Sequence, residues 1–258
     1  MLQAIPLDEA LINALTPWAW ISLSVGLLGA AWMMLDLRSR PPHMEIMRWV
    51  WPLAALWGSA FGIALYLLAG RASRADKGGM THTMSGMNMP GMKMDAMPSM
   101  SSMPTMAHGS GKPFWLRVGA GTAHCGAGCS LADMVGGWWF FFLPWTLAGS
   151  TILGEWVGEY VLALLFGVGF QYAAIQPMLH LPTGQAIARA FKVDFISLTA
   201  WQVGMYGFMA LVFFRWVGRV PSTEVAFWLL MQGAMISGFF CSYLANWWLI
   251  RAGIKPAM

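Results

Sequence analysis

Long apolar runs recur along this chain, separated by short polar segments and by one long polar segment. Six runs reach the roughly 20 residues that a helix needs to cross the hydrocarbon core of a bilayer. They cover residues 16–37, 49–70, 130–149, 155–177, 195–217 and 225–250. Lipid offers backbone groups no hydrogen-bond partners, so runs of this length must be helical. The pattern predicts an all-α, polytopic transmembrane helix bundle of about six spans.

The composition agrees with a membrane location. The chain is 58% hydrophobic and only 10% charged, whereas soluble domains carry about 25% charged residues. Tryptophans lie near several run ends, as an interfacial aromatic belt requires: Trp18, Trp20, Trp49, Trp51, Trp247 and Trp248. We expect a multi-pass protein of the bacterial inner membrane in direct contact with lipid. The formal net charge of +4 is spread over the loops, and the lack of a basic stripe argues against nucleic acid as a partner.

The long polar segment divides the chain into three regions. These are a transmembrane hairpin at 1–70, a loop at 71–113 and a membrane core at 114–258. Gly, Pro and Ser fill the loop between its Met and His residues, so it cannot bury a core and is predicted to be disordered. Its methionines recur every two to four residues, with a histidine near each end: Met80, Met84, Met87, Met89, Met92, Met94, Met97, Met100, Met103, Met106, His82 and His108.

These thioethers indicate a soft metal ion. A thioether is an uncharged ligand that does not titrate, and it favours Cu(I) over hard ions. Silver, as Ag(I), would be a mimic. One flexible strand with this spacing can wrap several sulfur atoms around one ion. A low-complexity linker is the alternative, but an exposed methionine has lost its usual role of filling gaps in a core.

A second candidate site lies in the string "GTAHCGAGCSLAD", at the start of the third apolar run. If a helix begins near residue 122, then Cys125, Cys129 and Asp133 share one face, and His124 lies beside Cys125. Two thiolates and an imidazole make a soft metal site. The predicted ligands are His124, Cys125 and Cys129, with Asp133 as an outer partner of the imidazole or as a proton carrier. The "GAG" between the cysteines is a weak helix former and can instead form an unwound turn.

Two alternatives remain open for the cysteines. Cys125 and Cys129 could form a disulfide, which an oxidising periplasm permits, or they could be small residues at a helix contact. Cys241 stands alone in an apolar run, and we expect it in the core.

Soft and acidic side chains also pair at helical spacing in the later runs. Met205 and Met209 share one helix face, and Met231 and Met235 share another. Glu155 and Glu159 lie one helical turn apart. Methionine pairs of this kind are commonly packing. A relay of thioethers through the bundle is the alternative.

The region from about residue 114 to 258 resembles a family of bacterial membrane proteins, domain of unknown function 4396. The resemblance is carried by "TAHCGAGCSLAD", "FKVDFISLTAWQVGMYGFMA" and "FCSYLANWWLIRAGIKPAM". It implies a polytopic membrane fold and no particular activity. The first hairpin and the Met-rich loop lie outside it.

Charge orients the first run. The loop after it carries Arg38, Arg40 and Arg48, whereas the segment before it carries only acids, so the N-terminus should face outside. If residues 49–70 cross the membrane, the Met-rich loop is periplasmic, which is our prediction. Strict alternation then leaves the later basic residues outside, against the same rule. A re-entrant segment at 121–149, or an inverted orientation with a cytoplasmic Met-rich loop, would remove that conflict.

These observations favour copper handling. The loop would capture Cu(I) and pass it to the Cys/His site for uptake, delivery or storage, with a membrane cuproenzyme or other membrane subunits as candidate partners. No phosphate loop or nucleophile motif is present, so we do not expect an enzyme. The alternatives are a subunit or assembly factor of a membrane complex and a dithiol redox protein that uses Cys125 and Cys129.

Overall fold

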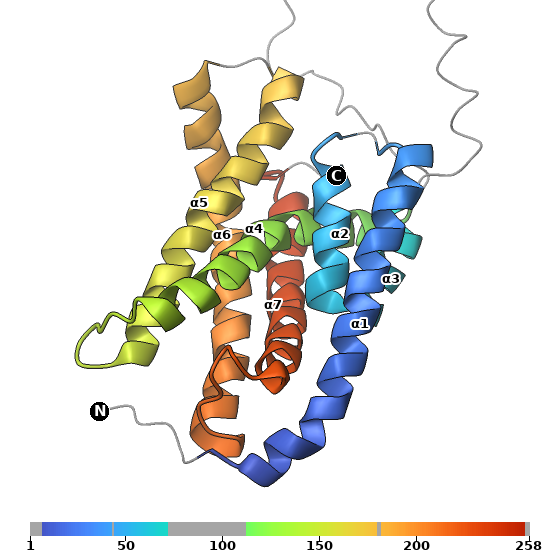
Figure 1. The fold of residues 1–258 in the computed structure, drawn as a ribbon. Coiled ribbons are helices and arrows are strands. Elements are labelled where there is room, and N and C mark those ends of the chain that lie inside the picture. The colour runs from blue at the N-terminus through green and yellow to red at the C-terminus, as the bar shows by residue number, and fades with distance from the viewer. Residues whose placement is uncertain (1–6, 43, 72–111, 180–181, 256–258) are drawn as a thin grey trace, which may run out of the picture.

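The computed structural model describes residues 7–42, 44–71, 112–179 and 182–255. The predicted metal ligands between Met80 and His108, and the predicted disorder of their loop, therefore lie outside the described residues. Within the described part the chain is helical, and the helices pack into a single bundle (Figure 1).

Four helical stretches are long and apolar enough to cross a membrane, which indicates a multi-pass membrane protein. They are Glu9–Ser39, Thr151–Ala174, Asp194–Trp216 and Val225–Arg251. They belong to α1 (Glu9–Ser39), α5 (Thr151–Leu179), α6 (Thr183–Leu211) with its π-helical extension η3 (Val212–Trp216), and α7 (Val225–Arg251). These four correspond to the first, fourth, fifth and sixth predicted runs.

The second predicted run does not cross the bundle. It forms α2 (Met47–Gly58), α3 (Ala60–Leu65) and a π-helical turn, η1 (Tyr66–Gly70). A Cβ on Gly62 would collide with the Ala54 carbonyl, and Trp51 packs on Tyr66 with ring centroids 5.6 Å apart. Residues on either side of the break therefore face each other, and the run is a helical hairpin. The prediction of a span at 49–70 was wrong.

The turn of this hairpin lies at Ser59, halfway along α1. Ser59 has φ +46°, the left-handed region that a non-glycine residue seldom adopts. Its Oγ donates to the Ser22 carbonyl at 2.8 Å, and Gln232 Nε2 donates to the Leu56 carbonyl at 2.8 Å. Ser22 Oγ in turn donates to Gln232 Oε1 at 2.6 Å. These bonds satisfy the polar groups that the turn exposes, so the hairpin can end inside an apolar bundle.

The third predicted run is displaced. The helix α4 (Phe114–Phe142) begins well before residue 122, and residues 143–150 form a loop. Helix α4 runs obliquely across the bundle (Figure 1). The "GAG" segment is regular helix, because its glycines permit close packing: a Cβ on Gly126 would collide with the Trp201 ring, and one on Gly128 would lie 2.6 Å from the Gly167 Cα. Small residues at helix contacts are typical of membrane bundles.

The bundle has two ends that differ in charge. At one end, Arg71 pairs with Asp36 at 3.0 Å, and Lys112 Nζ donates to the Ala69 carbonyl at 2.7 Å. The C-terminal part of the chain lies at this end too (Figure 1). We call it the basic end, after Arg38, Arg40, Arg48, Arg71, Lys112 and Arg251.

The opposite end joins the start of α1 to the connection between α6 and α7. Asp8 N donates to the Val217 carbonyl at 2.9 Å, and Ser222 Oγ donates to the Gly137 carbonyl of α4 at 3.0 Å. Because the hairpin returns the chain to the basic end, residues 71 and 112 both lie there. The segment 72–111 therefore starts and ends at the same end of the bundle.

Candidate functional site

The predicted site residues of α4 are all buried. His124, Cys125 and Asp133 are each 1% exposed, and Cys129 is fully enclosed. Cys125, Cys129 and Asp133 follow one another along one face of α4, at successive turns. Burying polar side chains in the interior of a membrane bundle costs free energy, and an intramembrane ionisable residue such as Asp133 indicates a functional site.

Cys125 forms a cluster with residues that are distant along the chain. Its Sγ donates to Asp194 Oδ1 at 2.8 Å, and Lys255 Nζ donates to the same sulfur at 2.8 Å. Lys255 also contacts Asp194 Oδ1 at 3.3 Å and Ser197 Oγ at 3.2 Å. Lys255 is only 3% exposed. We call Cys125, Asp194, Ser197 and Lys255 the Cys125 cluster.

Lys255 reaches this cluster because the chain reverses after α7. Gly253 has φ +71°, and Ile254 N donates to the Leu249 carbonyl at 3.0 Å. A glycine in this conformation commonly ends a helix. The turn sends Lys255 back into the bundle, so the cluster combines side chains of α4, α6 and the segment after α7.

Hydrogen bonds extend the cluster into α7. Ser242 Oγ donates to the Ser197 carbonyl at 2.8 Å, and Asn246 Nδ2 donates to Thr122 Oγ1 at 3.3 Å. This network holds α4, α6 and α7 at fixed mutual positions around Cys125. Buried polar groups in lipid need such partners.

Cys129 lies between the Cys125 cluster and an acidic pair. Its electrostatic neighbours are Asp133, Asp194 and Cys125. Cys125 and Cys129 are free thiols, so the disulfide is not formed. Cys241, expected in the core, is exposed on α7, at the edge of its contact with Gly204 of α6.

His124 projects in a different direction from the cysteines. Its ring meets Phe170 of α5 edge-on, with centroids 6.3 Å apart. Among the described residues, neither ring nitrogen makes a hydrogen bond of good geometry, but the buried side chain of Gln171 on α5 interacts with the imidazole. His124 is therefore enclosed by Phe170 and Gln171 of α5.

The three predicted ligands do not converge. Within residues 7–42, 44–71, 112–179 and 182–255, no three His, Cys, Asp or Glu side chains gather so that they could hold a metal ion. Cys125 is engaged by Lys255, and His124 faces α5. Coordination by His124, Cys125 and Cys129 together stays a prediction, and it would require Cys125 to leave Lys255.

Asp133 and Glu159 form the acidic pair beyond Cys129. Asp133 is an electrostatic neighbour of Glu159, and a Cβ on Gly136, one turn beyond Asp133, would lie 2.8 Å from Glu159 Cγ. Both carboxylate oxygens of Asp133 lack a hydrogen-bond partner among the described residues. One turn before Glu159 on α5, Glu155 pairs with Arg219 at the opposite end. In their order through the bundle, we call these side chains the polar column: Lys255, Asp194, Cys125, Cys129, Asp133 and Glu159.

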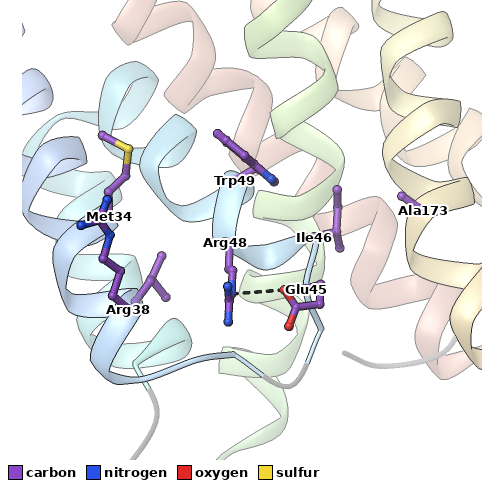
Figure 2. Close-up of a pocket in the computed structure, with 8 residues that line it drawn as sticks. Met34, Arg38, Glu45, Ile46, Arg48, Trp49 and Ala173 are labelled. Atoms are coloured by element: carbon purple, nitrogen blue, oxygen red, sulfur yellow. Dashed lines mark ion pairs between the residues drawn. The ribbon is translucent and has the colours of Figure 1, made fainter.

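A separate hollow of about 490 Å³ opens at the basic end. Figure 2 shows Arg38, Glu45, Arg48 and Trp49 around it, with Ala173 of α5 on the far wall. Arg48 pairs with Glu45 at 3.2 Å. None of the described residues that line the hollow belongs to the polar column.

Asp194, Ser197, Glu159 and Lys255 were not predicted as site residues. Asp194 and Lys255 do stand inside "FKVDFIS" and "RAGIKPAM", where a single charge interrupts or follows an apolar run. An intramembrane charge is a functional signal by default. Their partner, however, lies 69 and 130 residues away along the chain, and no local pattern indicates it.

Comparison with known proteins concerns the same region. No curated protein and no solved structure matches the chain. The model of the family described as "Domain of unknown function (DUF4396)" matches residues 114–255, from the start of α4 to Lys255. The match covers more than half of the chain, including every member of the polar column, so the chain belongs to the DUF4396 family.

Proposed function

We propose that this protein handles a soft monovalent metal ion, Cu(I), at the membrane, and that the polar column forms the ion's route through the bundle. The observation that carries the proposal is the column itself. Cys125, Cys129 and Asp133 follow one another along α4, and side chains of the neighbouring segments extend this row from Lys255 near the basic end to Glu159 near the opposite end. Intramembrane ionisable groups commonly mark ion pathways.

The sulfur atoms favour a soft metal over protons alone. Cys125 and Cys129 are free thiols, and thiolates select Cu(I). The Met/His-rich segment from Met80 to His108 supplies further soft ligands, and its flanking residues 71 and 112 lie at the basic end. An ion released by weak thioethers would meet the Cys125 cluster first.

Lys255 would occupy the Cys125 sulfur until a metal ion replaces it. Its ammonium group already supplies positive charge to the Cys125 sulfur at 2.8 Å. A Cu(I) ion that binds Cys125 as a thiolate takes over that role, and the thiol proton has Asp194 as its acceptor at 2.8 Å. Metal binding must displace thiol protons, so affinity at this site should fall as pH falls.

We also propose that the basic end faces the cytoplasm, as the positive-inside rule requires. The described acids Asp8 and Glu224 then lie outside with the opposite end. The predicted periplasmic position of the Met-rich loop depended on a crossing by residues 49–70, and the hairpin removes that crossing. In the revised orientation the loop starts and ends on the cytoplasmic side together with the basic residues of that end, whereas Arg215 and Arg219 stay at the opposite end, where Arg219 pairs with Glu155.

Single cysteines test the orientation. In a Cys241→Ser background, Ser39→Cys and Ser101→Cys should both stay unlabelled by an impermeant maleimide in intact spheroplasts, whereas Thr223→Cys should label. The background protein is the control, since Cys125 and Cys129 are buried. Labelling of Ser101→Cys together with Thr223→Cys would restore the periplasmic loop and refute the revised orientation.

Metal content tests the function. Protein purified anaerobically from copper-supplemented cells should carry Cu(I), and Cys129→Ser should carry less of it. Cys241→Ser is the matched control, because its thiol lies outside the polar column. A strain without the protein should also show altered growth across copper concentrations. If the protein carries no copper and the growth of the strain is unchanged, copper handling is refuted and the role as a subunit or assembly factor remains.

A further inference from the structure

A small cavity of about 30 Å³ lies between α5, α6 and α7, beside the last member of the polar column. Its wall includes Glu155 and Glu159 of α5, Met205 and Met209 of α6, and Met231 of α7. The three methionines are buried, with 0%, 3% and 6% of their surface exposed. The structure thus gathers at one point two of the pairs that are separate in the sequence and one member of the third, Met231.

We propose that this cavity binds one soft monovalent cation, Cu(I) or Ag(I), through the thioethers of Met205, Met209 and Met231 and the carboxylate of Glu159. The physiological role of the site rests on the proposed function. The binding itself rests on the cavity.

Packing alone explains the methionines but not Glu159. This side chain is 7% exposed and lines the cavity, and within the described residues its carboxylate has no hydrogen-bond or ion-pair partner. A buried carboxyl without a partner costs free energy. A cation in the cavity would remove that cost.

The charges of the wall select a monovalent ion. Glu155 is already paired with Arg219, which leaves Glu159 as the one unpaired carboxylate of the cavity wall, since Asp133 lies outside that wall. One carboxylate and one monovalent cation are together neutral, whereas a divalent ion would leave a net charge in a low-dielectric bundle. Hard cations also prefer a shell of oxygen ligands, which three sulfur atoms do not provide.

The size and walls of the cavity suit an ion without its hydration shell. A water molecule needs about 10–15 Å³ measured in this way, so about 30 Å³ leaves no room for a hydrated ion. Tyr206 and Trp156 stack with centroids 5.0 Å apart, and the Tyr206 hydroxyl donates to the Trp156 carbonyl at 2.6 Å. The two rings are therefore fixed as one side of the wall, and the flexible methionines can adjust to the ion.

The test is a count of the Cu(I) ions that full-length protein withholds from a chromogenic Cu(I) chelator under anaerobic conditions. The test variant combines Met205→Leu, Met209→Leu and Met231→Leu. The control combines Met33→Leu, Met47→Leu and Met235→Leu, which are equally buried and lie outside the cavity wall. Methionine and leucine have similar volumes, so both triple variants should fold, and equal thermal midpoints would verify this.

Each count is made in two backgrounds, the native chain and a chain whose ten methionines from Met80 to Met106 are serine. We expect the cavity variant to lose one Cu(I) in both backgrounds and the control to lose none. Glu159→Gln should keep that ion but weaken it by about tenfold or more, since it removes a charge a few ångströms from the cation. X-ray absorption of the loop-substituted protein should then report sulfur ligation.

The outcomes separate the two proposals. An unchanged count in the cavity variant overturns this inference, and the proposed function survives if the serine background or Cys129→Ser still lowers the copper content. If neither background withholds any Cu(I), both proposals fail. Equal losses in the cavity variant and the control would show a general packing effect and would also overturn the inference.

Discussion

The two ends of the polar column are built in opposite ways. At Cys125 every member of the cluster has a partner: a thiol, a carboxylate, a hydroxyl and an ammonium group lie within 3.5 Å of one another. At the other end, Asp133 has no hydrogen-bond partner among the described residues, and Glu159 faces a cavity. Among the described residues, one oxygen of the Cys125 cluster, Asp194 Oδ2, lacks a hydrogen-bond partner, whereas both carboxylate oxygens of Asp133 lack one.

This difference separates stability from binding. A satisfied buried network holds helices in place, and breaking it is costly. Unpartnered carboxylates contribute little to the fold, because removing them breaks no hydrogen bond. We therefore expect substitutions at the Cys125 cluster to change stability and substitutions at the acidic end to change binding.

Removal of Lys255 should have the largest effect on the fold. Lys255→Met leaves the Asp194 carboxylate buried without its cation, which typically costs about 3–5 kcal/mol. Thermal or denaturant unfolding of the detergent-solubilised protein would measure the loss. Lys192→Met, at an exposed position of α6, is the control and should be neutral. A midpoint for Lys255→Met equal to that of the control would mean that the Cys125 cluster does not hold the helices.

Substitution of Gly128, which packs against Gly167 of α5 between the two ends of the column, should have the next largest effect on stability. A Cβ there would lie 2.6 Å from both the Cα and the N of Gly167, and backbone atoms cannot rotate away. Gly128→Ala should therefore destabilise the protein by about 1–3 kcal/mol. Gly121→Ala, on the same helix with open space around it, should instead stabilise by up to about 1 kcal/mol. Equal midpoints for the two variants would refute the close contact.

Asp133→Asn should have the smallest effect on stability. No hydrogen bond is lost, and the amide keeps the shape of the carboxyl, so we expect a change within about 1 kcal/mol. Asp194→Asn is the comparison and should cost more, since it weakens the contacts with Cys125 and Lys255. If the two substitutions cost the same, the two ends of the column do not differ in their contribution to stability.

The sequence predicted the elements that depend on local pattern. The runs that became α1, α5, α6 and α7 are long and apolar, and lipid forces such runs into helices. The hairpin was missed because Gly58 and Ser59 carry no strong breaking signal. The turn is held by Ser22 and by Gln232, which lies 176 residues from its partner Leu56.

The candidate site was also predicted only where it depends on local spacing. Cys125, Cys129 and Asp133 share a face of α4, as their spacing indicates. The helix start and the "GAG" conformation were missed, because the glycines are set by contact with Trp201 and Gly167, not by intrinsic propensity. The cavity at Glu159 joins three helices, and spacing within one helix cannot show which other helix it meets.

The bond between Gln232 and Leu56 also constrains how the protein is assembled. Ribosomes deliver the chain from the N-terminus, so the hairpin reaches the membrane long before α7 exists to satisfy the Leu56 carbonyl. During that interval the turn has an unpaired polar group, and a water-filled insertion site or a chaperone must shelter it. The Cys125 cluster is completed later still, because Lys255 follows α7. Both polar centres of the membrane bundle therefore mature only after α7 has been made, and a chain that stops before α7 should be a substrate for membrane proteolysis.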